Sequence, residues 1–172
     1  MNISGISIIL PTLNEEENLK KIIPELVANF DDLGIDNYEI LIVDDSSEDQ
    51  TNYLVGLLNK ENEKIRLIER TEERSLPKSI RDGVLNSKCD YVMWMDADGS
   101  MTSQAVKELI ITQNNNPESI IIGSRFVNGG GYKGIEVTGK TNFFKAMYNI
   151  SKSNDSVLAT ILSKIFNNFL FF

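Results

Sequence analysis

The sequence contains no histidine and a single cysteine, Cys89, among its 172 residues. Imidazole is therefore excluded as a general base, a nucleophile or a metal ligand. One cysteine excludes an internal disulfide and a cysteine-rich zinc site. The N-terminus also lacks a basic flank and a long apolar region, so we expect no signal peptide and a cytoplasmic chain. Any chemistry falls to carboxylates, hydroxyls, arginine and lysine.

Positive charge is scarce in most of the chain. Residues 1–123 carry 11 Lys and Arg against 23 Asp and Glu, whereas residues 124–172 carry 6 against 2. This asymmetry predicts that the C-terminal part meets an anionic surface or ligand, and the alternative is a solvated face with no partner. With 41% hydrophobic and 24% charged residues, the chain is typical of one soluble globular domain.

Short apolar runs alternate with helical patterns along the chain. Such alternation predicts parallel strands joined by right-handed helical crossovers, an α/β fold. The expected strands are residues 6–10, 38–43, 65–68, 91–95 and 119–123. We expect Asn14 to cap the first helix and Pro24 to kink or divide it. Later helices are expected after Ser47 and over residues 78–87 and 102–114.

Asp96-Ala97-Asp98 follows the apolar run 91–95. Side chains alternate along a strand, so the two carboxylates point to the same side if the extended backbone persists through Ala97. Ligands of open α/β sheets bind at this end of the strands. Two oxygen ligands with open positions suit Mg²⁺ or Mn²⁺ when substrate phosphates complete the shell. The alternative is an ordinary turn at Asp98-Gly99 with Asp96 as a strand-end cap.

A second acidic pair, Asp44-Asp45, ends the expected strand 38–43. In a parallel sheet, both acidic pairs lie on the same edge. Asp45 is thus a candidate acceptor of hydrogen bonds from a base or ribose. The alternative is that it caps the following helix together with Ser46 and Ser47.

Four ordered motifs stand at these strand ends. They are Pro11-Thr12-Leu13-Asn14-Glu15, Val43-Asp44-Asp45-Ser46-Ser47, Asp96-Ala97-Asp98, and Gly123-Ser124-Arg125-Phe126 followed by Gly129-Gly130-Gly131. Together they resemble family 2 glycosyltransferases of the GT-A fold, and within them the polyprenol-phosphate (dolichol-phosphate) mannosyltransferases. The resemblance implies a Rossmann-like three-layer sandwich with a mostly parallel sheet. Residues 1–134 would form its nucleotide-sugar-binding core.

The resemblance also implies a nucleotide-sugar donor, with GDP-mannose expected, and Mg²⁺ or Mn²⁺. The residues that it places around the nucleoside are Pro11, Leu13, Glu15, Val43 and Asp45. Asp96, Ala97 and Asp98 would lie at the diphosphate, with the metal held chiefly by Asp98 and assisted by Asp96. Arg125 would reach the phosphates, which its rigid set of donors matches. Without the family resemblance, the expected role of Arg125 would be a surface ion pair. Asp96, Asp98 and Arg125 are the expected catalytic residues.

The acceptor implied by the resemblance is a polyprenyl phosphate at a membrane surface, and nucleic acid is not an expected partner. A lipid phosphate oxygen is already ionised at neutral pH, so it can attack the sugar without a general base. The chain departs from the family at Pro77, where glycine is usual, and at Gly99-Ser100, which puts a third side-chain metal ligand in doubt. It also stops before the usual acceptor segment, so we expect a truncated protein that binds donor and transfers poorly.

Two other function classes stay open. Asp96-x-Asp98-Gly99-Ser100 after an apolar strand also resembles the opening motif of haloacid-dehalogenase-type phosphatases. That motif normally lies near the start of its domain and is followed by a second acidic pair, whereas the acids after Asp98 are isolated. The third class is a non-catalytic remnant that binds a nucleotide without turnover.

Residues 135–172 are expected to form a C-terminal amphipathic helical segment. One helical face is apolar and consists of Val157, Leu158, Ile161, Leu162, Ile165, Phe166, Phe169 and Leu170. The apolar stretch, residues 157–170, is too short to span a bilayer. It would either lie at the membrane interface or pack in a core. The expected location is the cytoplasmic face of a membrane, with the protein bound peripherally.

Overall fold

The computed structural model describes residues 3–124, 131–132 and 135–136. The chain up to Ile122 forms one compact unit, and a second unit begins at Gly123. The sheet of the first unit has the strand order β3-β2-β1-β4, and every pair in it is parallel. Its strands are β1 (Ile6–Thr12), β2 (Tyr38–Asp44), β3 (Ile65–Glu69) and β4 (Tyr91–Trp94).

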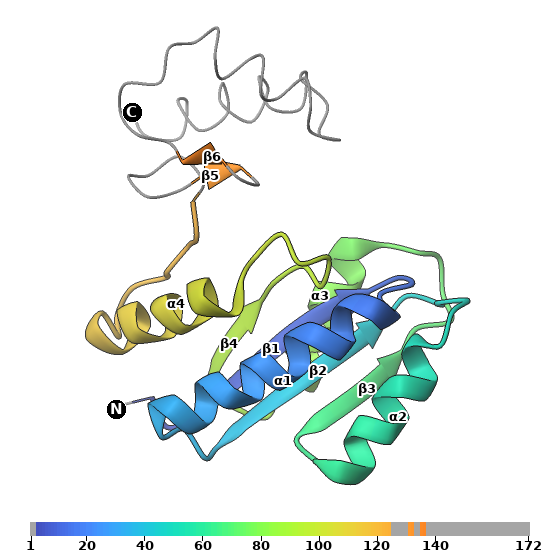
Figure 1. The fold of residues 1–172 in the computed structure, drawn as a ribbon, viewed down its shortest axis with the longest axis horizontal. Coiled ribbons are helices and arrows are strands. Elements are labelled where there is room, and N and C mark those ends of the chain that lie inside the picture. The colour runs from blue at the N-terminus through green and yellow to red at the C-terminus, as the bar shows by residue number, and fades with distance from the viewer. Residues whose placement is uncertain (1–2, 125–130, 133–134, 137–172) are drawn as a thin grey trace, which may run out of the picture. The chain divides into compact units, whose positions relative to one another are not determined.

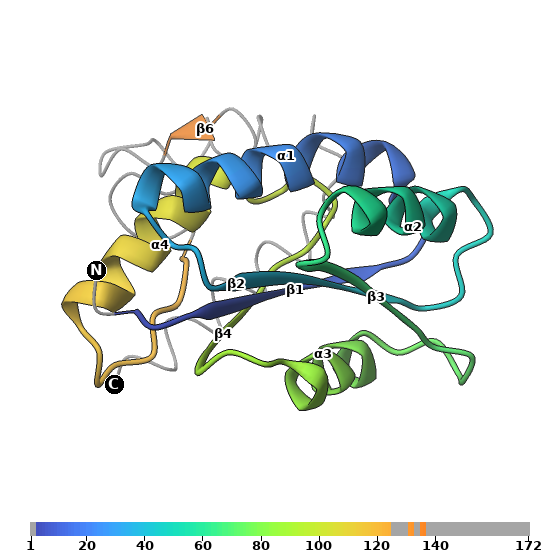
Figure 2. The ribbon, with the colours of Figure 1, turned by 90° about the horizontal axis from the view of Figure 1, so that it is seen from below.

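Helices follow the strands in turn and cover both faces of the sheet. They are α1 (Glu16–Leu33), α2 (Thr51–Glu61), α3 (Leu76–Asn86) and α4 (Ser103–Asn115). Figure 2 shows α1, α2 and α4 on one face and α3 alone on the other. Seen in Figure 1, the carboxyl ends of β1 and β2 point toward the same edge. The expected α/β three-layer sandwich is confirmed.

The larger core lies between the sheet and α1. Its helical side is the apolar face formed by Leu19, Ile22, Ile23, Leu26 and Phe30, all buried. The expectation that Pro24 divides this helix was wrong, because α1 runs without interruption from Glu16 to Leu33. Pro24 is exposed, and the buried residues on either side of it hold both halves of the helix to the same sheet face.

The α3 layer has far less apolar contact. The buried cluster on this face contains only Ile9, Leu41 and Val43, with Ile68 packed against it. Within α3 the buried residues are Ser79 and Gly83. A Cβ added at Gly83 would lie 2.5 Å from Cγ2 of Ile9, so glycine lets this helix approach β1 closely.

An ion pair between the half-buried Arg66 and the buried Glu39 fixes the C-terminal end of α3. Glu39 accepts hydrogen bonds from Ser7 Oγ at 2.7 Å, from the Lys88 backbone N–H at 2.5 Å and from Arg66 Nη1 at 2.5 Å. Arg66 also donates to the carbonyl of Asn86, the last residue of α3, at 3.3 Å. Burial alone would raise the pKa of Glu39, but the hydrogen bonds from Ser7, Lys88 and Arg66 lower it below its ordinary value.

The expected strand over residues 119–123 was wrong. This segment has no regular secondary structure and pairs with no strand of the part that the structure describes, and Ile120 and Ile122 are 90% and 80% exposed. A lone segment cannot satisfy its backbone N–H and C=O groups in a ladder, so β-propensity by itself does not make a strand. In the second unit, β5 (Gly131–Tyr132) and β6 (Ile135–Glu136) pair antiparallel.

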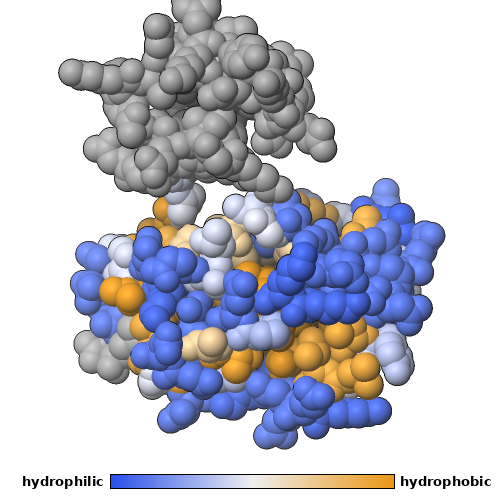
Figure 3. All heavy atoms as spheres, in the orientation of Figure 1, coloured by the Kyte–Doolittle hydropathy of each residue, from blue (hydrophilic) through white to orange (hydrophobic). Residues whose placement is uncertain are grey.

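Hydrophilic residues cover most of the face that carries α1 and α2, with smaller hydrophobic areas between them (Figure 3). Within the described residues, no helix combines the length and the apolar character needed to cross a bilayer. The expected apolar face over residues 157–170 lies outside the described residues, as does most of the segment 135–172. The expected boundary after residue 134 stays a prediction.

Replacing Gly83 by alanine tests the close approach of α3 to the sheet. Alanine favours a helix by about 1 kcal/mol over glycine. At Gly83 this gain is outweighed, because the new Cβ meets the fully buried Ile9 side chain, and overpacking costs about 1–3 kcal/mol. We expect Gly83→Ala to lower the melting temperature. The control is Gly56→Ala in α2. A Cβ at Gly56 meets open space, so this change should raise the melting temperature. Equal gains from both changes would contradict this packing.

Acid titration tests the Glu39 pair. The folded-state pKa of Glu39 is lowered, so its contribution to stability is complete above the unfolded value of about 4.3 and is lost as the pH falls through the folded value. Glu39→Gln should cost about 1–3 kcal/mol at neutral pH and flatten the loss of stability in acid. The measurement is the urea midpoint across a pH series, with the exposed Glu25→Gln as control. Parallel curves for the wild type and Glu39→Gln would refute the assignment.

Candidate functional site at the carboxyl edge of the sheet

The loop after β1 is fastened to the loop after β2. Three successive backbone N–H groups, those of Asn14, Glu15 and Glu16, donate to Ser47 Oγ at 2.7 Å, Thr51 Oγ1 at 3.1 Å and Asp49 Oδ2 at 3.2 Å. These are orphan donors before and at the start of α1, and the β2–α2 loop and the first residue of α2 satisfy them. The loop Leu13–Glu15 is therefore held rigidly at the sheet edge.

Asn14 does not cap α1, so that expectation was wrong. The residue adopts a left-handed backbone with φ of 60°, and its Oδ1 accepts from the backbone N–H of Glu48 at 2.7 Å. The residue at the helix start is Glu15, which makes no side-chain capping bond. Asparagine tolerates the left-handed conformation, and here its side chain links two loops.

Asp44 ties the ends of the two central strands together. Its carboxylate is fully buried and accepts from Thr12 Oγ1 at 3.0 Å and from the backbone N–H and hydroxyl of Ser47. Thr12 and Asp44 are also register partners in the β1–β2 ladder. The last residues of β1 and β2 are thereby locked side by side.

Asp45 turns toward α3. Its carboxylate pairs with the guanidinium of Arg70 and accepts from the backbone N–H of Ser75 at 2.5 Å. It is not a helix cap, because α2 begins at Thr51, after Gln50. Arg70 is itself buried and donates from Nε to Asp82 at 2.9 Å.

Asp96, Ala97 and Asp98 follow the end of β4. Ala97 is buried, whereas Asp96 and Asp98 are exposed, so the strand's alternation continues through the acidic pair. The backbone N–H of Ser100 donates to Asp98 Oδ1 at 2.7 Å, and Gly99 adopts a φ of 74°. The turn expected at Asp98-Gly99 and the two solvent-facing carboxylates therefore coexist.

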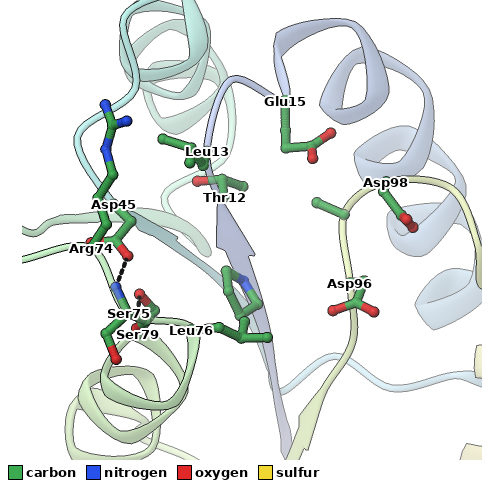
Figure 4. Close-up of a pocket in the computed structure, with 12 residues that line it drawn as sticks. Thr12, Leu13, Glu15, Asp45, Arg74, Ser75, Leu76, Ser79, Asp96 and Asp98 are labelled. Carbon is green, nitrogen blue, oxygen red and sulfur yellow. Dashed lines mark hydrogen bonds between the residues drawn. The ribbon is translucent and has the colours of Figure 1, made fainter. Parts of the chain in front are cut away.

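A cavity of about 420 Å³ opens between these elements. The expected site residues that line it are Pro11, Leu13, Glu15, Asp45, Asp96, Ala97 and Asp98. Figure 4 shows Asp96 and Asp98 on one side, and Asp45, Arg74 and Ser75 on the other. Of the expected residues that the structure describes, Val43 does not line the cavity. Val43 is wholly buried in the sheet, and Arg125 lies outside the described residues, as do Gly129 and Gly130.

The residues on the α3 side of the cavity were not among the expected site residues. They are Arg74, Ser75, Leu76 and Ser79, and Thr12 adds a further hydroxyl from β1. The resemblance covers the segment Ser75-Leu76-Pro77-Lys78-Ser79 and implies a different donor fit there because of Pro77, but it names none of these residues as site residues. Pro77 takes the second position of α3, where its missing N–H costs nothing. The signal available in the sequence was Arg74, a cation shortly before the expected start of a helix that begins at this edge.

The walls of the cavity are mostly acidic. Their charged groups are the carboxylates Glu15, Asp45, Asp96 and Asp98 and the guanidinium of Arg74. Asp45 is neutralised by Arg70, whereas Arg74 contacts the Ser46 carbonyl and Glu48, each at 3.0 Å. Among the described residues, no three carboxylates or thiolates cluster closely enough to enclose a metal ion. Asp96 and Asp98 could therefore supply only part of a coordination shell.

The sequence of residues 134–141 also matches the pattern G-x-x-x-x-G-K-[ST] of phosphate-binding loops. Such a loop must cradle phosphates with its backbone N–H groups between a strand and a helix. Of these eight residues the structure describes only Ile135 and Glu136, which pair with Tyr132 and Gly131 in an antiparallel ladder. The match of letters by itself assigns no phosphate site.

Three curated relatives share the N-terminal part of their sequence with this chain, and each is named dolichol-phosphate mannosyltransferase. The protein of Pyrococcus furiosus is 36% identical over 127 residues, which are 73% of this chain and 34% of the relative. The proteins of Mycosarcoma maydis and Saccharomyces cerevisiae are 32% and 29% identical, over 70% and 73% of this chain and 42% and 46% of their own length. The chain thus spans a third to a half of these relatives.

Solved structures show a likeness of fold. The crystal structure of a mycobacterial protein matches 65% of this chain and 37% of its own with a TM-score of 0.51 at 18% identity. The mannosyltransferase PcManGT from Pyrobaculum calidifontis, solved with GDP-Man and Mn²⁺, matches 60% of this chain and 32% of its own with a TM-score of 0.49 at 24% identity.

The family model named "Glycosyl transferase family 2" matches residues 7–171, nearly the whole chain. This match favours the glycosyltransferase resemblance over the phosphatase one, and it agrees with the GT-A type of α/β fold expected from the motifs. The acidic pair also follows the fourth strand rather than the first, unlike the opening motif of a phosphatase. The chain therefore belongs to glycosyl transferase family 2.

Proposed function

We propose that the cavity binds a nucleoside-diphosphate sugar and that a divalent cation, held by Asp98 with help from Asp96, meets the diphosphate. The observation that carries this proposal is the pair of exposed carboxylates beyond β4 on the wall of a cavity of about 420 Å³. Two carboxylates leave most of an octahedral shell open, and substrate phosphates and water commonly complete such shells.

The donor atoms present fit Mg²⁺ or Mn²⁺. Both cations prefer carboxylate oxygens, and the described residues offer no thiolate beside the pair that would select a softer metal. The bound cation would supply positive charge against the leaving diphosphate. The fold holds Asp96 and Asp98 on the side of the cavity opposite α3. The donor can then lie between the two carboxylates and the α3 wall.

The nucleoside is proposed to lie on the side of Pro11, Leu13 and Glu15. These residues line the cavity and belong to the loop that is fastened to the β2–α2 loop. A rigid wall lowers the entropy cost of binding a flat base. Val43 would support this wall from within the sheet, where it is buried.

The proposed reaction is transfer of mannose from GDP-mannose to a polyprenyl or dolichyl phosphate. Support comes from the relatives named dolichol-phosphate mannosyltransferase at 36% and 32% identity. It also agrees with the complete lack of histidine, because an ionised phosphate oxygen attacks the anomeric carbon without a general base. The bond to the leaving diphosphate breaks as the new sugar–phosphate bond forms.

Two parts of the proposal rest on sequence alone. Arg125 would donate to the phosphates and stabilise the charge that grows on the leaving group. Residues 124–172, which carry 6 Lys and Arg against 2 Asp and Glu, would hold the protein to the cytoplasmic face of an anionic membrane through an apolar helical face.

Removing one carboxylate tests the metal-dependent binding of the donor. A diphosphate placed beside Asp96 and Asp98 without a cation is repelled by like charge. Asp98→Asn should therefore weaken GDP binding about 10- to 100-fold in Mn²⁺ and change it little in EDTA. Calorimetry with GDP measures both affinities. The control is Asp90→Asn, an exposed aspartate just before the other end of β4. Equal wild-type affinity for GDP with and without metal would remove the basis of the proposal.

A further inference from the structure

We propose that the outer face of α3 and the exposed face of β4 together dock onto an anionic lipid membrane. This α3 surface consists of Lys78, Arg81, Val84 and Leu85 on the helix and Val92 and Trp94 on the strand. The inference goes beyond the proposed membrane contact of residues 124–172, because it lies in the unit that carries the cavity. It rests on the proposed function for its purpose, the delivery of a lipid phosphate acceptor.

The buried residues of α3 show which of its side chains point away from the sheet. Ser79 and Gly83 are buried, and Gly83 lies directly over β1. A helix turns by about 100° per residue, so Arg81 and Leu85 stand on the opposite side of α3. Their exposure agrees with this, because the Arg81 side chain is 67% exposed and Leu85 is 73% exposed. No other described helix lies on this face of the sheet (Figure 2).

The strand β4 carries apolar side chains on the same face. Trp94 is the register partner of Ile9, which lies beneath α3, so Trp94 points to the α3 side of the sheet. Val92 shares that side because it lies two residues earlier. The helix packs over β1 and β2, and Trp94 and Val92 stay 50% and 41% exposed. Val84, 45% exposed, lies on the side of α3 away from Asp82, which contacts the residue after β3.

Charge distinguishes the α3 surface from the rest of its unit. Residues 76–88 carry three cations and one acid, which are Lys78, Arg81, Lys88 and Asp82. Residues 1–123 as a whole carry 11 Lys and Arg against 23 Asp and Glu. The Asp82 carboxylate is paired with the buried Arg70 at 2.9 Å and with Arg81 at 3.1 Å. Two more acids, Asp90 and Asp96, lie beyond the two ends of β4, at the margins of the surface.

Exposed leucine, valine and tryptophan beside cations are typical of a surface that binds at a membrane interface. The apolar side chains enter the boundary between headgroups and acyl chains, and the cations attract anionic lipids. Tryptophan favours this boundary because its ring is apolar and its N–H is polar. A second copy of this chain fits the surface less well, because two-fold pairing would place the cations of one copy against those of the other.

The α3 surface adjoins the cavity. Leu76, the first residue of α3, lines the cavity and is 49% exposed, and Asp96 follows Trp94 by two residues. A membrane against the surface would bring lipid headgroups close to the cavity, where the proposed acceptor phosphate has to arrive.

Trp94 is the only tryptophan of the chain, so its fluorescence reports on this surface directly. The test adds the full chain to vesicles of phosphatidylcholine and phosphatidylglycerol, with and without brominated acyl chains. We expect the emission of Trp94 to shift to shorter wavelength and the brominated lipid to quench it, because bromine quenches only at short range. Vesicles of phosphatidylcholine alone should have a weaker effect, since they carry no net negative charge.

Flotation of variants with the anionic vesicles measures the contribution of each kind of side chain. Lys78→Gln/Arg81→Gln should weaken vesicle binding about 10- to 30-fold, because each cation near an anionic membrane contributes about fivefold. Leu85→Ser should also weaken it. The matched control is Tyr53→Ser/Leu57→Ser on α2, on the other face of the sheet, where the two residues are 66% and 41% exposed. This control should bind as the wild type does.

Three results would overturn the inference. They are a chain that does not bind these vesicles, a chain that binds them while Trp94 is neither shifted nor quenched, and an equal loss of binding in the α2 control. A second copy as the occupant would also overturn it. Sedimentation without vesicles would then show a dimer that Leu85→Ser dissociates, and lipid would not quench Trp94.

Calorimetry with GDP and Mn²⁺ separates this inference from the proposed function. Lys78, Arg81 and Leu85 do not line the cavity, so their variants should keep the GDP affinity of the wild type. A wild type that binds no GDP while lipid quenches Trp94 would refute the proposed function and support the membrane contact. GDP binding in Mn²⁺ without any quenching of Trp94 would refute the membrane contact alone.

Discussion

The parallel register of β1, β2 and β4 determines where everything else in the site lies. Thr12 stands beside Asp44, and Ile9 stands beside Trp94, so the three strands end at one edge with their loops on the same side. Polar residues that are far apart in sequence become neighbours there. The buried Asp44 locks this edge by accepting from Thr12 and Ser47. Without that register, neither the acidic pair nor the α3 wall would face a common cavity.

Much of the fold could be predicted from the sequence, because apolar periodicity reports burial directly. The four strands of the sheet and the helices between them occur where the patterns placed them. The strand expected over residues 119–123 failed for a different reason. A strand needs a partner strand. The β-branched residues Ile120, Ile121 and Ile122 indicate β-propensity, but they do not reveal whether a partner lies alongside.

The site could be predicted in part. Residues that immediately follow strands, such as Leu13, Asp45 and Asp96, reach the cavity because strand ends are readable from sequence. What Asn14 and Asp45 contact there was not readable. Asn14 links two loops through a left-handed backbone, and Asp45 pairs with Arg70, which is 25 residues away. Such long-range polar contacts leave no periodic trace in one sequence.

Charge gives the site its chemical character. The cavity walls carry four carboxylates, and the carboxylate of Asp45 is paired with the buried Arg70. Such a surface attracts cations and repels free diphosphate, which is why the proposed diphosphate ligand would need a bridging cation there. The two walls then have distinct tasks. The β4 side would hold the cation, and the clamped α3 side would limit where the rest of the ligand can lie.

A crystal structure of this chain with GDP and Mn²⁺ tests the central claim most directly. The account predicts an anomalous scattering peak for manganese at coordination distance from the Asp98 carboxylate and a diphosphate oxygen, with the nucleoside between Leu13 and the α3 wall. A manganese peak away from Asp96 and Asp98, or GDP bound outside the cavity, would contradict it.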